Sequence, residues 1–144
     1  MQRGIDFIGV GVGAIIFRDD GKIFLAKRGR GARNERGKWE FPGGSVEFGE
    51  TLSQALIREI QEEFGFSIQV ERLLDVVDHI LPDEQQHWVS PTFLCRYGSG
   101  TPAILEPHKC DAIEWFPPSS LPESELTSAS FKSLESLKRY LSRT

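Results

Sequence analysis

The sequence comprises 144 residues, with 17 Lys and Arg against 21 Asp and Glu, and carries a formal net charge of −4 at pH 7. This length suits one domain with its own hydrophobic core, so we expect residues 1–144 to fold as a single domain. The acidic balance argues against a general nucleic-acid binder, because binding to a phosphate backbone requires a basic surface.

The N-terminal part predicts a β-hairpin. Residues 7–17 are apolar and partly β-branched, and residues 22–27 follow a turn around Asp20-Gly21. The first run superficially resembles a signal peptide, but Asp6 interrupts it and no small-residue cleavage site follows. Because the run is also too short to span a bilayer as a helix, we predict a buried strand and no membrane association.

The middle of the chain predicts a loop, a short strand and a helix. A loop rich in glycine and arginine is expected at 29–37, and a short strand at 38–41 ends in the breaker Pro42-Gly43-Gly44. The helix at 51–64 begins with a capping box of Thr51 and Gln54 and ends at Gly65.

The C-terminal half predicts further strands and a last helix. We expect strands at 67–79, 87–97 and 112–116, a turn at 80–86, an irregular loop at 98–108, and a helix at 128–141 with Phe131, Leu134, Leu137 and Leu141 on one face. Helices and strands intermix without a regular βαβ count, so the pattern alone indicates α+β or α/β.

Three glutamates gather at the C-terminal end of the helix predicted at 51–64. At about 100° per residue, one stripe of this helix contains Leu52, Ala55, Leu56, Glu59, Glu62 and Glu63. A second face, expected to pack in the core, contains Ile57, Ile60 and Phe64. Clustered carboxylates at this helix end oppose the macrodipole and repel one another. The alternatives are a solvated acidic face and a site for a hard divalent cation with oxygen ligands.

The stretch from Gly44 to Phe66 resembles the Nudix box. The matching positions are Gly44, Glu50, Arg58-Glu59, Glu62-Glu63 and Gly65, with apolar residues at Ile60 and Phe66. The chain is therefore identified as a member of the Nudix hydrolase superfamily. This resemblance implies the Nudix fold, a mixed β-sheet sandwiched between α-helices, and metal-dependent hydrolysis of a nucleotide phosphoanhydride bond.

The resemblance also implies roles for individual residues. Glu62 and Glu63 would bind Mg²⁺, or Mn²⁺ in its place, and the backbone carbonyl of Gly43 would be a further ligand. Glu59 would bind metal or act as the general base, directly or through water. Which acid takes the proton differs within the family and stays open. Arg58 would orient the acids, through an ion pair with Glu50 that bridges the loop and the helix.

Candidate substrate contacts lie outside this helix. Six basic residues fall within positions 27–38, and Lys27 or Arg28, at the strand end, is the favoured clamp for a polyphosphate. Phe48, in the turn before the helix, is a candidate for stacking on a nucleobase. Glu106 lies where some relatives place an additional acidic ligand. Core or rim packing is the alternative for Phe48 and for the three tryptophans, Trp39, Trp88 and Trp115.

The surrounding segments narrow the activity that the resemblance implies. Residues 38–51 and 105–122 are similar to MutT-like nucleoside triphosphate pyrophosphohydrolases, which release a monophosphate and pyrophosphate. ADP-ribose hydrolysis is the alternative, because some such enzymes carry a proline shortly after the box, where Pro82 lies here. A non-catalytic Nudix-like binding module would have lost acids, and none is missing. An isopentenyl diphosphate isomerase would need a cysteine and glutamate environment that Cys95 and Cys110 do not convincingly supply.

The remaining expectations concern cysteines, histidines and partners. Cys95 and Cys110 show neither metal-ligand spacing nor a disulfide framework, which predicts reduced thiols in a cytoplasmic protein. No ligand pairing is evident for the histidines, which are interpreted as incidental: His79, His87 and His108. We expect a small nucleotide as substrate and no nucleic-acid polymer as partner. The sequence leaves open the physiological substrate and the oligomeric state, a homodimer included.

Overall fold

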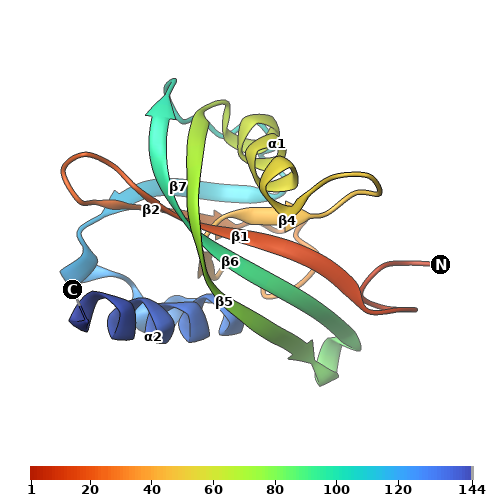
Figure 1. The fold of residues 1–144 in the computed structure, drawn as a ribbon. Helices are drawn as coiled ribbons and strands as arrows, with labels where there is room; N and C mark the ends of the chain where they lie inside the picture. The colour runs from red at the N-terminus through yellow and green to blue at the C-terminus, as the bar shows by residue number, and fades with distance from the viewer. Residues whose placement is uncertain (144) are drawn as a thin grey trace.

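A mixed sheet of seven strands lies between two helices in the computed structural model, which describes residues 1–143 (Figure 1). The strands are β1 (Gly9–Phe17), β2 (Ile23–Arg28), β3 (Trp39–Glu40), β4 (Gly43–Ser45), β5 (Ser67–Leu81), β6 (Gln86–Ser99) and β7 (Cys110–Phe116). The helices are α1 (Leu52–Phe64) and α2 (Ser128–Ser142), and short 3₁₀ turns occupy Pro82–Glu84, Pro118–Ser120 and Glu123–Glu125. This arrangement confirms the expected fold class.

Strand β1 organises the sheet because it pairs with three others. It runs parallel to β6 and antiparallel to β2 and β4, and the order across the main path is β3-β2-β1-β6-β5. Strand β4 pairs with the first half of β1, with Val12 opposite Gly44. The breaker expected at residues 42–44 is thus replaced in part by a strand. A Cβ atom at Gly43 would overlap the carbonyl of Val12, so glycine permits this close approach.

Alternate residues of β1 enter two separate cores. Ala14 and Ile16 pack in a cluster with α1, whereas Ile15 packs in a second cluster with α2. Successive side chains of a strand point to opposite faces, so the two helices cover opposite faces of the sheet. Figure 1 shows α1 and α2 on these two sides. Neither helix within residues 1–143 is long and apolar enough to cross a membrane.

Helix α1 begins and ends as the sequence predicts, but its core face differs. Thr51 and Gln54 form the capping box, and Gly65 ends the helix with a left-handed backbone, φ 72°. The expectation that Ile57 packs in the core was wrong, since 43% of it is exposed. The buried positions are Ala55, Leu56, Ile60 and Phe64. The last three recur at i, i+4 and i+8, so the sheet contacts this stripe rather than the one through Ile57.

Helix α2 likewise buries only part of its predicted apolar face. Leu134 and Leu137 are buried, but Phe131 and Leu141 are 44% and 45% exposed. The buried face includes Ser130 and Ser133 instead. The buried face of α2 is therefore rotated from the apolar stripe that the sequence predicts. Two of the leucines and two serines face the sheet, and the other two apolar residues of the stripe are partly exposed to solvent.

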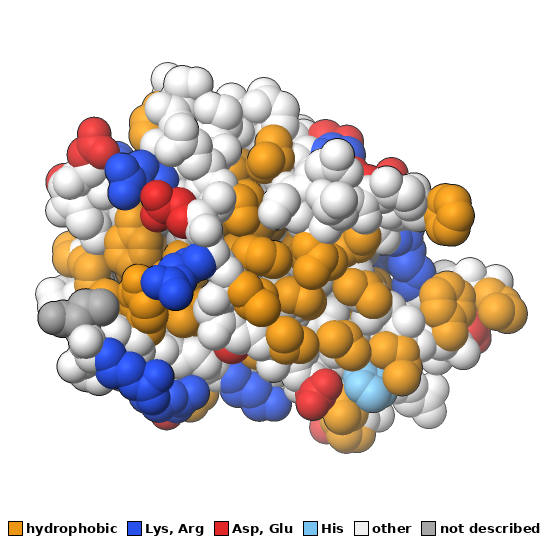
Figure 2. Space-filling model, in the orientation of Figure 1, with side chains coloured by type: hydrophobic (Ala, Val, Ile, Leu, Met, Phe, Trp, Pro, Cys, Tyr) orange, Lys and Arg blue, Asp and Glu red, His pale blue; other side chains and the backbone are white. Residues whose placement is uncertain are grey.

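Strands β5 and β6 form a hairpin that extends past the predicted boundaries at both ends of its turn. Their ladder runs from Ser67 opposite Ser99 to Leu81 opposite Gln86, with three irregularities along it. Figure 2 shows apolar side chains gathered over the face that β5 crosses, and exposed apolar residues of β5 are Leu73, Val76 and Ile80. Both cysteines are free and buried, and burial raises their thiol pKa values, to about 12 for Cys95 and about 11 for Cys110.

Candidate active site

A cavity of about 690 Å³ opens beside β1 and reaches from α1 to the first half of α2. Its walls come from the seven strands and the two helices, together with the loop between β2 and β3. This volume lies in the range of small-molecule sites. The glutamates of α1 that the sequence singled out line the cavity: Glu59, Glu62 and Glu63.

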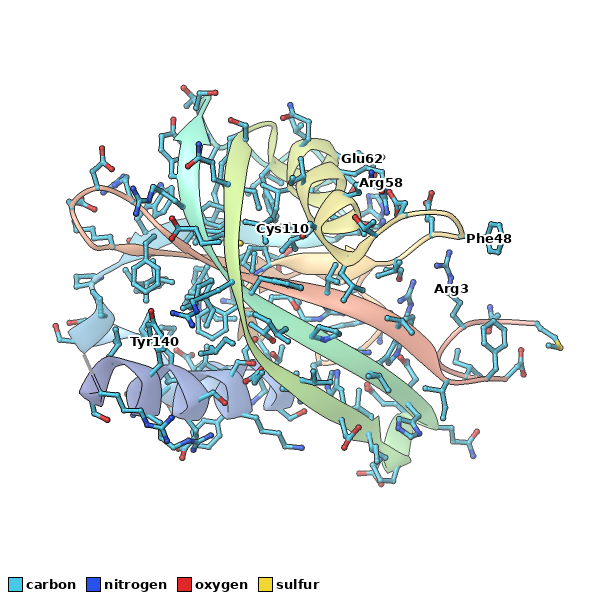
Figure 3. All side chains as sticks on the ribbon, viewed as in Figure 1. Arg3, Phe48, Arg58, Glu62, Cys110 and Tyr140 are labelled. Carbon is cyan, nitrogen blue, oxygen red and sulfur yellow. The ribbon has the colours of Figure 1, made fainter. Side chains whose placement is uncertain are left out.

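Arg58 holds two of these acids, Glu59 and Glu62, from within α1. Its Nε and Nη2 atoms donate to the Glu50 carboxylate at 2.6 and 2.9 Å, which confirms the expected ion pair across the loop. Its Nη1 atom donates to Glu59 and to Glu62, each at 3.1 Å, and Nη2 also reaches the carbonyl of Ser45 at 3.1 Å. Figure 3 shows Arg58 and Glu62 together on α1, beside the loop from β4. Arg58 therefore fixes the loop, the helix and two acids relative to one another.

Glycine at position 44 brings β4 against the acid cluster. A Cβ atom there would overlap the carboxyl group of Glu59. Both Gly43 and Gly44 line the cavity. Because neither residue has a side chain, the backbone of β4 can lie close to Glu59.

Burial and nearby acids raise the pKa values of two of the cavity glutamates, Glu59 and Glu63. Burial, reinforced by Glu59, Glu40 and Glu106, raises the pKa of Glu63 to about 9. Burial also raises the pKa of Glu59, against the opposing charge of Arg58. Each carboxylate in such a cluster disfavours the charge on the others. A cation bound among them would relieve this repulsion.

The donor types in this cluster fit a hard divalent cation. Every candidate ligand is an oxygen atom, from Glu59, Glu62, Glu63 or the Gly43 carbonyl, as Mg²⁺ prefers. Within residues 1–143, however, no three His, Cys, Asp or Glu side chains are arranged to hold a metal ion. Arg58 contacts Glu59 and Glu62 through its guanidinium, each at 3.1 Å, and offsets part of their charge.

Basic side chains occupy another part of the cavity lining. Arg3, Lys27, Arg33 and Lys109 line it, as does Arg28. Arg28 donates to the Glu40 carboxylate and to the Asn34 carbonyl at 2.9 and 2.8 Å, so its guanidinium braces the loop between β2 and β3. Lys27 has no ion pair among the described residues.

The other predicted contacts divide into those the fold brings to the cavity and those it does not. Glu106 and Trp88 line it, whereas Phe48 is fully exposed at the tip of its turn and does not. In Figure 3 the Phe48 side chain projects away from the body of the protein. Trp39 and Trp115 pack edge-on against Phe116 and Phe24, as expected for core or rim positions.

Several cavity residues were not singled out by the sequence. Asn34 and Gln86 are both buried and hydrogen-bonded to each other at 2.9 Å, although 52 positions separate them. His79, interpreted as incidental, lines the cavity and contacts Glu35 at 2.9 Å. Further lining residues are Ser90, Thr92, Thr127, Ser130 and Ser133. No local motif marks these positions, because only the tertiary fold brings β6, α2 and the loop after β2 together.

The chain is similar to known proteins along most of its length. A model of the NUDIX domain matches residues 8–137. The chain is 35% identical to the CTP pyrophosphohydrolase of Escherichia coli (strain K12) over 127 residues, which covers 86% of the chain and 87% of the relative. It is 48% identical to the 8-oxo-dGTP diphosphatase of Proteus vulgaris over 61 residues, which covers 42% of the chain and 54% of the relative.

Solved structures agree with this match. A MutT NUDIX hydrolase from Burkholderia pseudomallei superposes with a TM-score of 0.80 and 42% sequence identity, covering 92% of this chain and 99% of the other. Several curated relatives are much longer than the matched region, and the match covers between 27% and 54% of their length.

Proposed function

The chain belongs to the NUDIX domain family, and on this premise we propose that it hydrolyses nucleoside triphosphates to a monophosphate and pyrophosphate, with Mg²⁺ as cofactor. The observation that carries the proposal is the acid cluster of α1 at a cavity of about 690 Å³, held by Arg58 and Glu50. The named relatives that cleave nucleotides support it.

Metal binding is assigned to four groups of this chain. Glu62 and Glu63 would hold Mg²⁺, or Mn²⁺ in its place, with Glu59 and the Gly43 carbonyl completing the protein ligands. When bound, the ion would neutralise charge on phosphate oxygens and position the attacking water. Burial raises the pKa values of Glu59 and Glu63, and a cation bound beside them would favour their charged forms, which supports this assignment.

The other residues bind and orient the substrate. As the alternative to binding the metal, Glu59 would accept the proton of the attacking water, directly or through a second water. Arg58 would act by positioning Glu59 and Glu62, because its guanidinium is already bonded to both. Lys27 would contact the phosphate chain, and Arg28 would act mainly by fixing the loop that it braces.

A release assay tests the proposal. Canonical and oxidised nucleoside triphosphates, ADP-ribose and dinucleotides are incubated with the protein and Mg²⁺, and pyrophosphate and phosphate are measured. The expected result is pyrophosphate from triphosphates, lost in Glu62→Gln and kept in Glu135→Gln, which changes an exposed glutamate of α2. Removing a metal ligand should lower kcat on the order of 10²- to 10³-fold. Turnover of ADP-ribose alone, or full activity of folded Glu62→Gln, would contradict the proposal.

A further inference from the structure

A buried amide side chain, that of Asn34, lies in the wall of the cavity. Asn34, the sole asparagine of the sequence, lies in the loop between β2 and β3 and is only 6% exposed. It lines the cavity, and its Nδ2 atom donates to Gln86 Oε1 at 2.9 Å. Its backbone carbonyl accepts from Arg28 at 2.8 Å, so both ends of the residue are fixed.

The indole N–H of Trp88 determines the orientation of the Asn34 amide, through its hydrogen bond to Gln86. The Nε1 atom of Trp88 lies 3.0 Å from Gln86 Oε1, and an indole N–H can only donate. The Gln86 atom that receives it must therefore be the oxygen, while Gln86 Nε2 donates to the Arg33 carbonyl at 3.1 Å. The Asn34 atom that contacts the same oxygen must then be a donor, so Asn34 meets Gln86 through nitrogen. The network excludes the flipped amide, which would place two oxygens together.

The consequence is a hydrogen-bond acceptor that faces the cavity. With its nitrogen on Gln86, Asn34 has its side-chain oxygen Oδ1 left, and no described residue donates to that oxygen. This oxygen is also not among the buried polar atoms that lack a partner in residues 1–143, so it is accessible. Because Asn34 lines the cavity, access comes from there. A ligand that leaves this acceptor unpaired in a closed site would bind more weakly.

Two aromatic side chains, Trp88 and His79, lie in the cavity wall near this acceptor. The Trp88 indole reaches Asn34 through Gln86, and the adjacent Glu35 holds the ring of His79 at 2.9 Å. Both aromatic side chains line the cavity. The guanidinium of Arg33 lies over the Trp88 ring, 4.6 Å from its centre, and Trp88 is only 5% exposed, so the indole supports the cavity wall and fixes the amides beside it.

We propose that Asn34 is a specificity-determining residue that accepts a hydrogen bond from an N–H group on the edge of the substrate's base. Gln86 and Trp88 are positioning residues, because they fix the orientation of the Asn34 amide. This inference rests on the proposed function for the identity of the substrate as a nucleotide. It adds a prediction about base specificity. The protein should bind a nucleotide more tightly when its base can donate an N–H to Asn34 than when a similar base cannot.

Two substitutions separate this role from a structural one. Asn34→Leu removes the donor to Gln86 and the acceptor to the cavity, with little change in shape. Asn34→Asp removes the same donor but keeps an oxygen acceptor. Both variants lose the hydrogen bond to Gln86. If Asn34 only tethered its loop, the two substitutions would therefore change ligand binding to the same extent. Thermal unfolding of both proteins, compared with wild type, shows whether each is folded.

Binding of nucleoside monophosphates, measured by calorimetry with Mg²⁺, gives the readout without any need for hydrolysis. One pair is 8-oxo-dGMP and dGMP, in which the oxidised base carries an N–H at N7 and a carbonyl at C8 where guanine has a bare N7 and a C–H. The other pair is UMP and 3-methyl-UMP, in which a methyl group replaces the hydrogen at N3. Wild type should favour the N–H member of at least one pair about tenfold, as expected for one buried hydrogen bond. Asn34→Asp should keep this ratio, and Asn34→Leu should bring it below about threefold.

Three results with these two pairs would overturn the inference. They are equal binding within both pairs by wild type, an unchanged ratio in Asn34→Leu, and an equal loss in Asn34→Leu and Asn34→Asp. A preference of UMP over dUMP that disappears in Asn34→Leu, without an N–H preference, would assign the acceptor to the sugar and also refute it. The pyrophosphate assay tests the proposed function separately, so each can fail without the other.

Discussion

The guanidinium of Arg58 and the carboxylate of Glu50 form a two-point ion pair that joins α1 to the loop before it, at 2.6 and 2.9 Å. The same guanidinium contacts Glu59 and Glu62, which line the cavity. A planar fork with several donors can make these contacts at once, whereas an ammonium group cannot. Arg58 is thus a shared anchor for the loop and the acids.

Replacing Arg58 with lysine should therefore damage activity while the fold survives. The charge remains, but the two-point contact with Glu50 is lost, and Glu59 is no longer held. We expect kcat to fall about 10- to 100-fold, as for other residues that orient metal ligands. Steady-state kinetics with far-UV circular dichroism check this. An unchanged kcat in the folded variant would show that Glu59 and Glu62 do not need Arg58.

The ion pair also predicts how stability depends on pH. The hydrogen bonds from Arg58, and that from the backbone of Glu47, lower the pKa of Glu50 from 4.5 to about 2. Since the folded-state pKa lies below the unfolded value, Glu50 contributes stability that is present above about pH 4.5 and is lost as the pH falls towards 2. Urea unfolding at several pH values should show wild type more stable than Glu50→Gln at neutral pH. The difference should shrink across this window, and a constant difference would contradict the assignment.

Gly44 should tolerate no side chain. In Gly44→Ala the new methyl group would overlap the carboxyl group of Glu59, so Glu59 must move away from the cluster. Displacing a catalytic group by about 1 Å can cost on the order of 10²-fold in rate. Gly13→Ala is the matched control, because its Cβ atom would meet Thr92 at an ordinary 3.7 Å. Comparable kcat values in the two variants would argue against a role for Glu59.

The two faces of α1 should respond differently to truncation. Leu56 is fully buried against the sheet, so Leu56→Ala should lower the free energy of unfolding by about 2–5 kcal/mol. Ile57 is 43% exposed, and Ile57→Ala should cost within about 1 kcal/mol. Denaturant unfolding of both variants measures the difference. Equal destabilisation would mean that Ile57 contributes as much to the core as Leu56 and would contradict this packing of α1.

Local signals predicted the elements well where each element carries its own marker. Thr51, Gln54 and Gly65 define the ends of α1, because capping depends on neighbouring backbone groups. The strand β4 was missed, because Gly43-Gly44 reads locally as a breaker and pairs only with the distant Val12 and Gly13. The buried face of α1 was assigned partly wrongly, since two adjacent apolar stripes differ only in which one meets the sheet.

The sequence by itself determined the chemistry that can occur here. The spacing of Glu50, Arg58, Glu59, Glu62 and Gly65 within one loop and helix specifies an acid cluster, and spacing along a helix sets which side chains meet. Tertiary structure alone decided what else faces that cluster. It buried Asn34, Gln86 and Trp88 together and left Phe48 in solvent. The physical reason is that contacts across more than 50 positions depend on how the sheet is ordered, which no local pattern encodes.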